Sequence, residues 1–175
     1  MVPFRFGEES VAPEHLHVVG LVREVGLGGD DVTAFVGAPW AFGFARIFLE
    51  KFEQASAEHL APLRTEIAQA LVMALDDPAF PVPDRLAASA GVAITHAKYP
   101  AILASELAEE LCSFAKDAVR GRTPPPCTLA FHRVTTSGAS DYETIRAQEL
   151  TVESEGTWNV LTMAPYVVGE RATAP

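Results

Sequence analysis

The sequence is poor in cysteine, with only Cys112 and Cys127 among its 175 residues. Neither belongs to a closely spaced pair of the kind that binds zinc, and two cysteines do not make a disulfide framework. No apolar run approaches the roughly 20 residues that cross a bilayer as a helix, and the first residues lack the apolar segment of a secretory signal. These absences predict a soluble protein of the reducing cytoplasm, with no membrane partner.

Positive charge is also scarce, since 13 Lys and Arg residues face 23 Asp and Glu residues and the formal net charge is -10. A chain of this charge is not attracted to a phosphate backbone at long range, so extensive direct binding to nucleic acid is not expected. Carboxylates remain good ligands for divalent cations, and through such cations for nucleoside triphosphates. The composition, 49% hydrophobic and 21% charged, is that of a globular domain.

A short acidic turn lies between two segments rich in β-branched residues. Residues 17–25 (HVVGLVREV) and 32–36 (VTAFV) are predicted strands, and the connection contains Gly28-Gly29-Asp30-Asp31. Turn chemistry alone explains glycine and aspartate here, because both tolerate positive φ. The other interpretation is a metal site, in which the carboxylates hold divalent cations and the glycines let a nucleotide approach the backbone. The motif by itself leaves both open.

The rest of the chain shows alternating helix and strand patterns. Apolar residues recur at helical spacing from Pro39 to Leu75, as one helix kinked near Pro62 or as two helices. A small-residue strand within 86–95, a helix over about 101–120 and a strand over 127–135 follow. This order predicts an α+β fold, an antiparallel-containing sheet with helices on one face. With a strand and helix in front, it is the βαββαβ ferredoxin-like arrangement.

We place the domain over residues 1–135, with its core over 17–135, and treat residues 136–175 as a C-terminal extension with little regular structure. Few periodic signals occur in that extension. One possible strand lies at residues 158–163 (WNVLTM).

Three motifs occur in a fixed order: the Gly-Gly-Asp-Asp hairpin, the segment SAGVAITHAKYP at residues 89–100, and a helix that ends Ser-Phe-Ala-Lys at Lys116. This layout resembles the palm domains of the large polymerase-like subunit of type III CRISPR effector complexes. It is more distantly similar to GGDEF-type diguanylate cyclases. The resemblance covers about residues 21–116 and extends less clearly through the strand near residues 131–136.

The resemblance implies ATP binding with Mg²⁺ or Mn²⁺ and, in active members, conversion of ATP to cyclic oligoadenylate in antiviral defence. Asp30 and Asp31 then correspond to the metal-binding acidic pair, and Gly28 and Gly29 to the glycines of the turn. Lys116 corresponds to a lysine that approaches the triphosphate in related cyclases.

Palms of this family also take a metal ligand from an aspartate on a strand before the hairpin. Residues 1–21 contain no aspartate, and their acids are Glu8, Glu9 and Glu14. We therefore expect a palm that lacks its first strand-helix unit and presents an open sheet edge to a protein partner or to a second copy. A catalytically inactive palm, acting as an assembly or nucleotide-sensing module, is the alternative.

Several other polar residues have ordinary structural explanations at this level. The segment from His96 to Pro100 leads into a helix, where Lys98 would meet a phosphate, or it is a surface loop. His132 is interpreted as a structural or surface histidine. Solvated faces, loops or isolated pairs account for the remaining candidates: Glu106, Glu109 and Glu110, Asp76 and Asp77, and His15 and His17.

Overall fold

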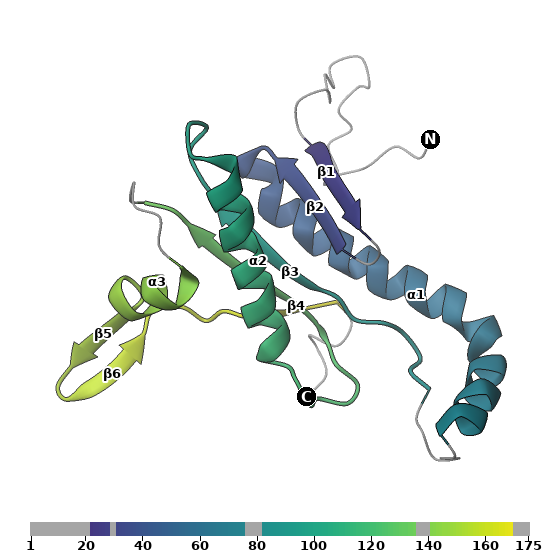
Figure 1. Cartoon of the computed structure of the whole chain (residues 1–175). Helices are drawn as coiled ribbons and strands as arrows, with labels where there is room; N and C mark the ends of the chain where they lie inside the picture. The colour runs from purple at the N-terminus through teal and green to yellow at the C-terminus, as the bar shows by residue number, and fades with distance from the viewer. Residues whose placement is uncertain (1–21, 29–30, 76–81, 136–140, 170–175) are drawn as a thin grey trace, which may run out of the picture. The chain divides into compact units, whose positions relative to one another are not determined.

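The computed structural model describes residues 22–28, 31–75, 82–135 and 141–169 (Figure 1). The chain forms two compact units, residues 1–40 and 41–175. Among the described residues, no helix combines the length and apolar character needed to cross a bilayer.

The first unit contains the predicted hairpin. Strand β1 (Val22–Gly28) pairs antiparallel with β2 (Asp31–Val36), and the register sets Gly28 opposite Asp31. The pairing shifts between Glu24 and Gly26, as in a β-bulge. Residues 17–21 of the predicted first strand lie outside the described residues. The hairpin is confirmed, with β1 reaching three residues further along the chain than predicted.

One long helix follows, α1 (Ala38–Leu75), and it contains Pro62. Of the two predicted possibilities, the single helix is therefore correct. Beyond residue 40 it belongs to the second unit, where Ala45 and Leu49 are buried.

The second unit is built on a mixed sheet of three strands in the order β3-β4-β7. Strand β3 (Ser89–Ile94) runs parallel to β4 (Cys127–Arg133), and β7 (Tyr166–Val168) pairs antiparallel with β4. Helix α2 (Ala101–Asp117) connects β3 to β4. The predicted strands 86–95 and 127–135 and the predicted helix 101–120 are confirmed with shorter bounds.

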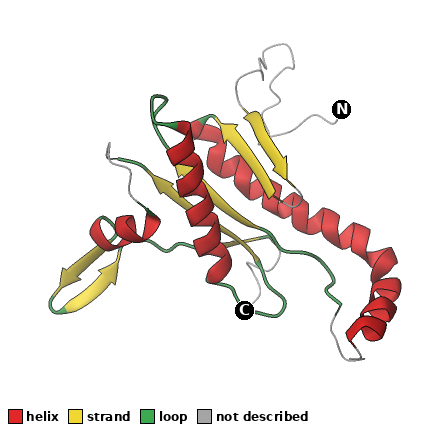
Figure 2. Ribbon diagram, in the orientation of Figure 1, coloured by secondary structure: helices red, strands yellow, loops and turns green. Residues whose placement is uncertain are grey.

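Strand β4 is covered by helices on both faces. Its Cys127 and Leu129 pack with Leu49 of α1, whereas Ala130 packs with Leu107 and other residues of α2. The ribbon diagram shows these two helices beside the sheet (Figure 2). Because successive side chains of a strand point to opposite faces, one helix lies on each side. The predicted α+β class is confirmed, but the expectation of helices on one face was wrong for this sheet.

The prediction of little regular structure after residue 135 was also wrong. Helix α3 (Tyr142–Gln148), strands β5 (Thr151–Ser154) and β6 (Thr157–Val160), and β7 lie in that region. The predicted strand 158–163 overlaps β6. Since β7 completes the sheet, the boundary drawn after residue 135 divides elements that belong together.

Helix α2 approaches β3 so closely that only glycine fits at Gly91. A Cβ atom there would collide with the Ala108 carbonyl oxygen and stand 2.5 Å from the Cys112 amide nitrogen. Both obstacles are backbone atoms, which cannot turn aside as a side chain can. The position therefore fixes the distance between helix and strand.

We predict that Gly91→Ala lowers the free energy of unfolding by about 3 kcal/mol or more, because α2 must move away from β3. Gly121→Ala is the matched control. Gly121 has φ of 85°, and a Cβ added there would have no neighbouring atom within 4 Å. The Gly121→Ala variant should therefore lose only about 1 kcal/mol of stability, through backbone strain. Urea unfolding of both variants measures the difference. Equal losses would contradict the close packing at Gly91.

Candidate functional site

The acidic turn lies at the tip of the β1–β2 hairpin. Gly28 ends β1 and Asp31 begins β2, so two residues connect the paired strands. These two, Gly29 and Asp30, lie outside the described residues. Asp31 is exposed, and a solvent-facing carboxylate is a suitable oxygen ligand for Mg²⁺ or Mn²⁺. The hairpin therefore presents at least one of the two predicted metal ligands to solvent.

Lys116 lies in the last turn of α2 and is exposed. A cation at this end of a helix is favourable on electrostatic grounds alone, because the helix dipole is negative there. Asp31 belongs to the first compact unit and Lys116 to the second. They are separate candidate positions, each with a structural explanation as well as a functional one.

Within the described residues, no group of three or more His, Cys, Asp or Glu side chains has a metal-binding arrangement. Of the two predicted metal ligands, the described residues include Asp31 alone. Asp76, Asp77, His15 and His17 also lie outside those ranges.

His96 takes part in the turn that leads into α2. Its Nδ1 accepts a hydrogen bond from the Lys98 amide at 3.2 Å, and its ring stands edge-on to Tyr99. Pro100 then occupies the N-cap position of α2 without a side-chain cap. These contacts explain the segment as a turn that leads the chain into α2. Lys98, in the same turn, is exposed.

The acidic face of α2 has a partner that the sequence did not reveal. Glu110 Oε2 accepts a hydrogen bond of 2.6 Å from the Tyr142 amide, which ties α3 to α2. Arg146 lies 4.9 Å above the Phe114 ring. An open groove of about 700 Å³ runs here, lined by Glu106, Glu109, Glu110, Ser113, Phe114, Asp141, Tyr142, Glu143 and Arg146. Glu110 is exposed, as the solvated helix face predicted, and it also makes this contact with α3.

His132 is buried on β4, beneath α3. Its Nε2 lies 4.0 Å from Glu149 Oε2, and its ring is tilted against that of Tyr142. Burial lowers the pKa of His132 below its ordinary value, and the Glu149 carboxylate opposes that shift. The structural interpretation of this histidine holds, because it fills the space between sheet and helix.

The lowered pKa of His132 predicts a loss of stability in mild acid. The unfolded chain takes up the proton near the ordinary pKa of about 6.5, whereas the folded protein resists it, so unfolding binds protons. The free energy of unfolding should therefore fall as the pH drops below about 6.5. His132→Gln, which cannot be protonated, should show a shallower decline in urea unfolding. His59→Gln controls for removing an exposed histidine. Equal slopes in wild type and His132→Gln would contradict the prediction.

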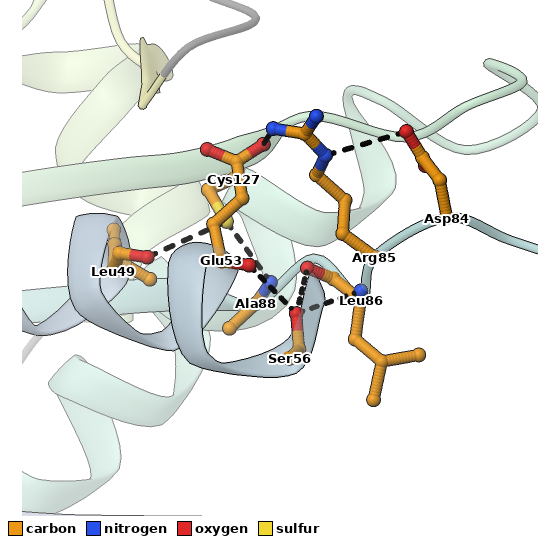
Figure 3. Close-up of polar contacts among 8 residues, drawn as sticks. All are labelled: Leu49, Glu53, Ser56, Asp84, Arg85, Leu86, Ala88 and Cys127. Atoms are coloured by element: carbon orange, nitrogen blue, oxygen red, sulfur yellow. Dashed lines mark hydrogen bonds and ion pairs between the residues drawn. The ribbon is translucent and has the colours of Figure 1, made fainter. Parts of the chain in front are cut away.

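A buried carboxylate lies elsewhere in the second unit. Glu53 of α1 is only 2% exposed, and its Oε1 lies 3.9 Å from Arg85 Nη1 (Figure 3). Arg85 Nε in turn lies 3.4 Å from Asp84 Oδ2. Gly169 has φ of 90°, and a Cβ there would meet Glu53 Oε2. Ionic contacts and tight packing therefore account for Glu53 as a structural residue.

The segment around Arg85 is also fastened to α1 and β4 by hydrogen bonds (Figure 3). Ser56 Oγ accepts from the Leu86 amide at 2.9 Å and lies 3.4 Å from the Leu86 carbonyl oxygen. The Ala88 amide donates to Cys127 Sγ at 3.4 Å. Together these contacts guide the chain into β3.

We predict that Arg85→Met lowers the free energy of unfolding by about 1–3 kcal/mol, because it leaves the buried Glu53 carboxylate with less positive charge nearby. In a Glu53→Gln background the same change should cost much less. Urea unfolding of the two single variants and the double variant forms the cycle that measures this coupling. Additive effects would show that the two side chains do not interact.

No protein-family model, curated protein or solved structure matches this chain. The function must therefore be argued from its own residues.

Proposed function

We propose that this chain is a palm-type domain that transfers a nucleotidyl group from ATP to a ribose hydroxyl, with a cyclic oligoadenylate-type product, as part of a type III CRISPR effector. The observation that carries the proposal is the position of Gly-Gly-Asp-Asp at the tip of a paired antiparallel hairpin, with Gly28 opposite Asp31. The subsequent order of long helix, SAG-containing strand and helix with Ala-Lys in its last turn supports it. Under this proposal the fold is a ferredoxin-like palm.

Each residue of the turn then has a distinct role. The carboxylates of Asp30 and Asp31 would hold Mg²⁺ or Mn²⁺, and the exposure of Asp31 is compatible with that role. A bound divalent cation neutralises charge on the triphosphate and activates the attacking hydroxyl. Gly28 and Gly29 would leave room for the nucleotide against the backbone. Lys116 would contribute positive charge to phosphate binding.

A non-catalytic palm that serves in assembly or nucleotide sensing is the second candidate. The observation in its favour is that residues 1–21 contain no aspartate, the residue type that such palms use as a further metal ligand before the hairpin. It differs from the first candidate in one measurable respect, the turnover of ATP.

The decisive experiment incubates the purified protein with labelled ATP and Mg²⁺ or Mn²⁺ and separates the products by chromatography. We expect product from wild type and a loss of about 100-fold or more in the Asp30→Ala, Asp31→Ala variant, since charge stabilisation by bound cations is removed. The Asp76→Ala, Asp77→Ala variant removes a second acidic pair and is the matched control.

Product that survives in the Asp30→Ala, Asp31→Ala protein would remove these residues from the mechanism. If no protein forms product, calorimetric titration with ATP and the cation decides between the candidates: cation-dependent binding would favour nucleotide sensing, and no binding would favour assembly.

A further inference from the structure

Strand β3 is an edge strand of the three-stranded sheet in the second unit. It pairs with β4 alone among the described strands. None of its six residues is fully buried, whereas the first four residues of β4 are. Its two faces are covered, because Gly91 lies against α2 and Ala90 and Val92 pack with the α1 cluster. The remaining exposure therefore belongs to the edge itself.

The hydrogen bonds to β4 show which backbone groups point outward. The Ala88 carbonyl accepts from the Thr128 amide at 3.1 Å, and the Ile94 carbonyl accepts from the Val134 amide at 2.9 Å. In a parallel pair, alternate residues direct both backbone groups to the same neighbour. Residues 88, 90, 92 and 94 therefore face β4, and residues 89, 91 and 93 direct their amide and carbonyl groups to the free edge. The Ser89 carbonyl also accepts a hydrogen bond from Cys112 Sγ at 3.3 Å.

Other strand edges among the described residues carry features that discourage pairing. Strand β7 has three residues and is followed by Gly169, whose φ is 90°. The β1–β2 hairpin has a bulge and the charged residues Arg23, Glu24 and Asp31. Strands β5 and β6 have four residues each, and β5 carries Glu153. Strand β3 has no charge, no proline and no bulge, so it lacks the usual protection of an edge strand.

We propose that β3 pairs antiparallel with β3 of a second copy of this chain, across a two-fold axis at Gly91. This register sets Gly91 against itself and Ser89 against Ala93. Residues whose backbone amide and carbonyl groups point away from β4 are then opposite one another. Each such pair can form two hydrogen bonds, as alternate residue pairs of an antiparallel ladder do. A shift by one residue would set outward groups against inward ones. The strand is thus complementary to itself, as an isologous interface requires.

Charge favours this edge as the contact between copies. Each chain carries a formal charge of -10, so two copies repel each other, and a contact at an uncharged surface adds the least to that repulsion. Strand β3 is uncharged, and the α2 residues that lie over Gly91, Ala108 and Cys112, are uncharged as well. Because only a short strand contributes, the dimer should be weak and depend on protein concentration.

The first test uses the wild-type chain and no nucleotide, so it is independent of the proposed enzymatic activity. Sedimentation velocity from about 1 µM to about 500 µM should show a monomer that becomes a dimer as concentration rises. Residue-resolved hydrogen exchange should show slower exchange of the Gly91 and Ala93 amides in the dimer. The Ala90 and Val92 amides, bonded to β4, should be protected at every concentration and serve as internal reference.

The second test removes one outward amide. Ala93→Pro deletes an N–H that points away from β4, and should weaken the dimer about tenfold or more because the two-fold repeats the loss. Ala93→Ser keeps the amide and should dimerise as wild type does. Circular dichroism and urea unfolding confirm that each variant is folded.

Three results would overturn the proposal. A monomer at all concentrations with rapidly exchanging Gly91 and Ala93 amides would show that the edge stays open. Protection of these amides in the monomer would show that another part of the same chain covers the edge. A dimer that a folded Ala93→Pro variant leaves intact would place the contact elsewhere. If Ala93→Pro does not fold, the exchange measurement on wild type decides alone.

Discussion

Burial of β4 on both faces is the constraint on which the second unit depends. Cys127 and Leu129 face the α1 cluster, and Thr128 and Ala130 face α2, with the Thr128 hydroxyl donating to the Ala115 carbonyl at 3.1 Å. A central strand whose two faces are both shielded from solvent requires another structural layer, such as a helix, on each face of the sheet. The close approach at Gly91 fixes the distance of α2 from the sheet, and the ionic contact between Glu53 and Arg85 joins α1 to the segment that leads into β3.

Elements with strong local signals were predictable from the sequence. The apolar stripe of α2 and the β-branched runs of the hairpin determine their own secondary structure. Helix α3 and strand β7 were missed because they are short and depend on distant partners. Glu110 binds the Tyr142 amide across 32 positions of sequence, and Val168 packs with Leu49. The Glu155-Gly156 pair, both at positive φ, was a local turn signal that could have revealed the β5–β6 hairpin.

The candidate site, too, could be predicted from the sequence only in part. Composition and motif order identify the acidic turn, and the register of Gly28 with Asp31 fits a hairpin tip. Sequence patterns could not show that Glu53 would be buried, since its neighbour Gly169 lies far along the chain. They also gave no sign that His132 and Glu110 would both contact Tyr142 of α3. Periodicity reports on one element at a time, whereas these roles arise from contacts between elements.

The position of β7 in the sheet has a consequence for synthesis. Leu49 and Glu53 leave the ribosome long before Val168 and Gly169, which complete their surroundings. At usual rates of translation the interval is on the order of ten seconds. During that time an apolar helix face and a carboxylate destined for the interior stand without their final cover. Nascent chains of this protein should therefore be clients of chaperones that bind apolar helices until the last strand emerges.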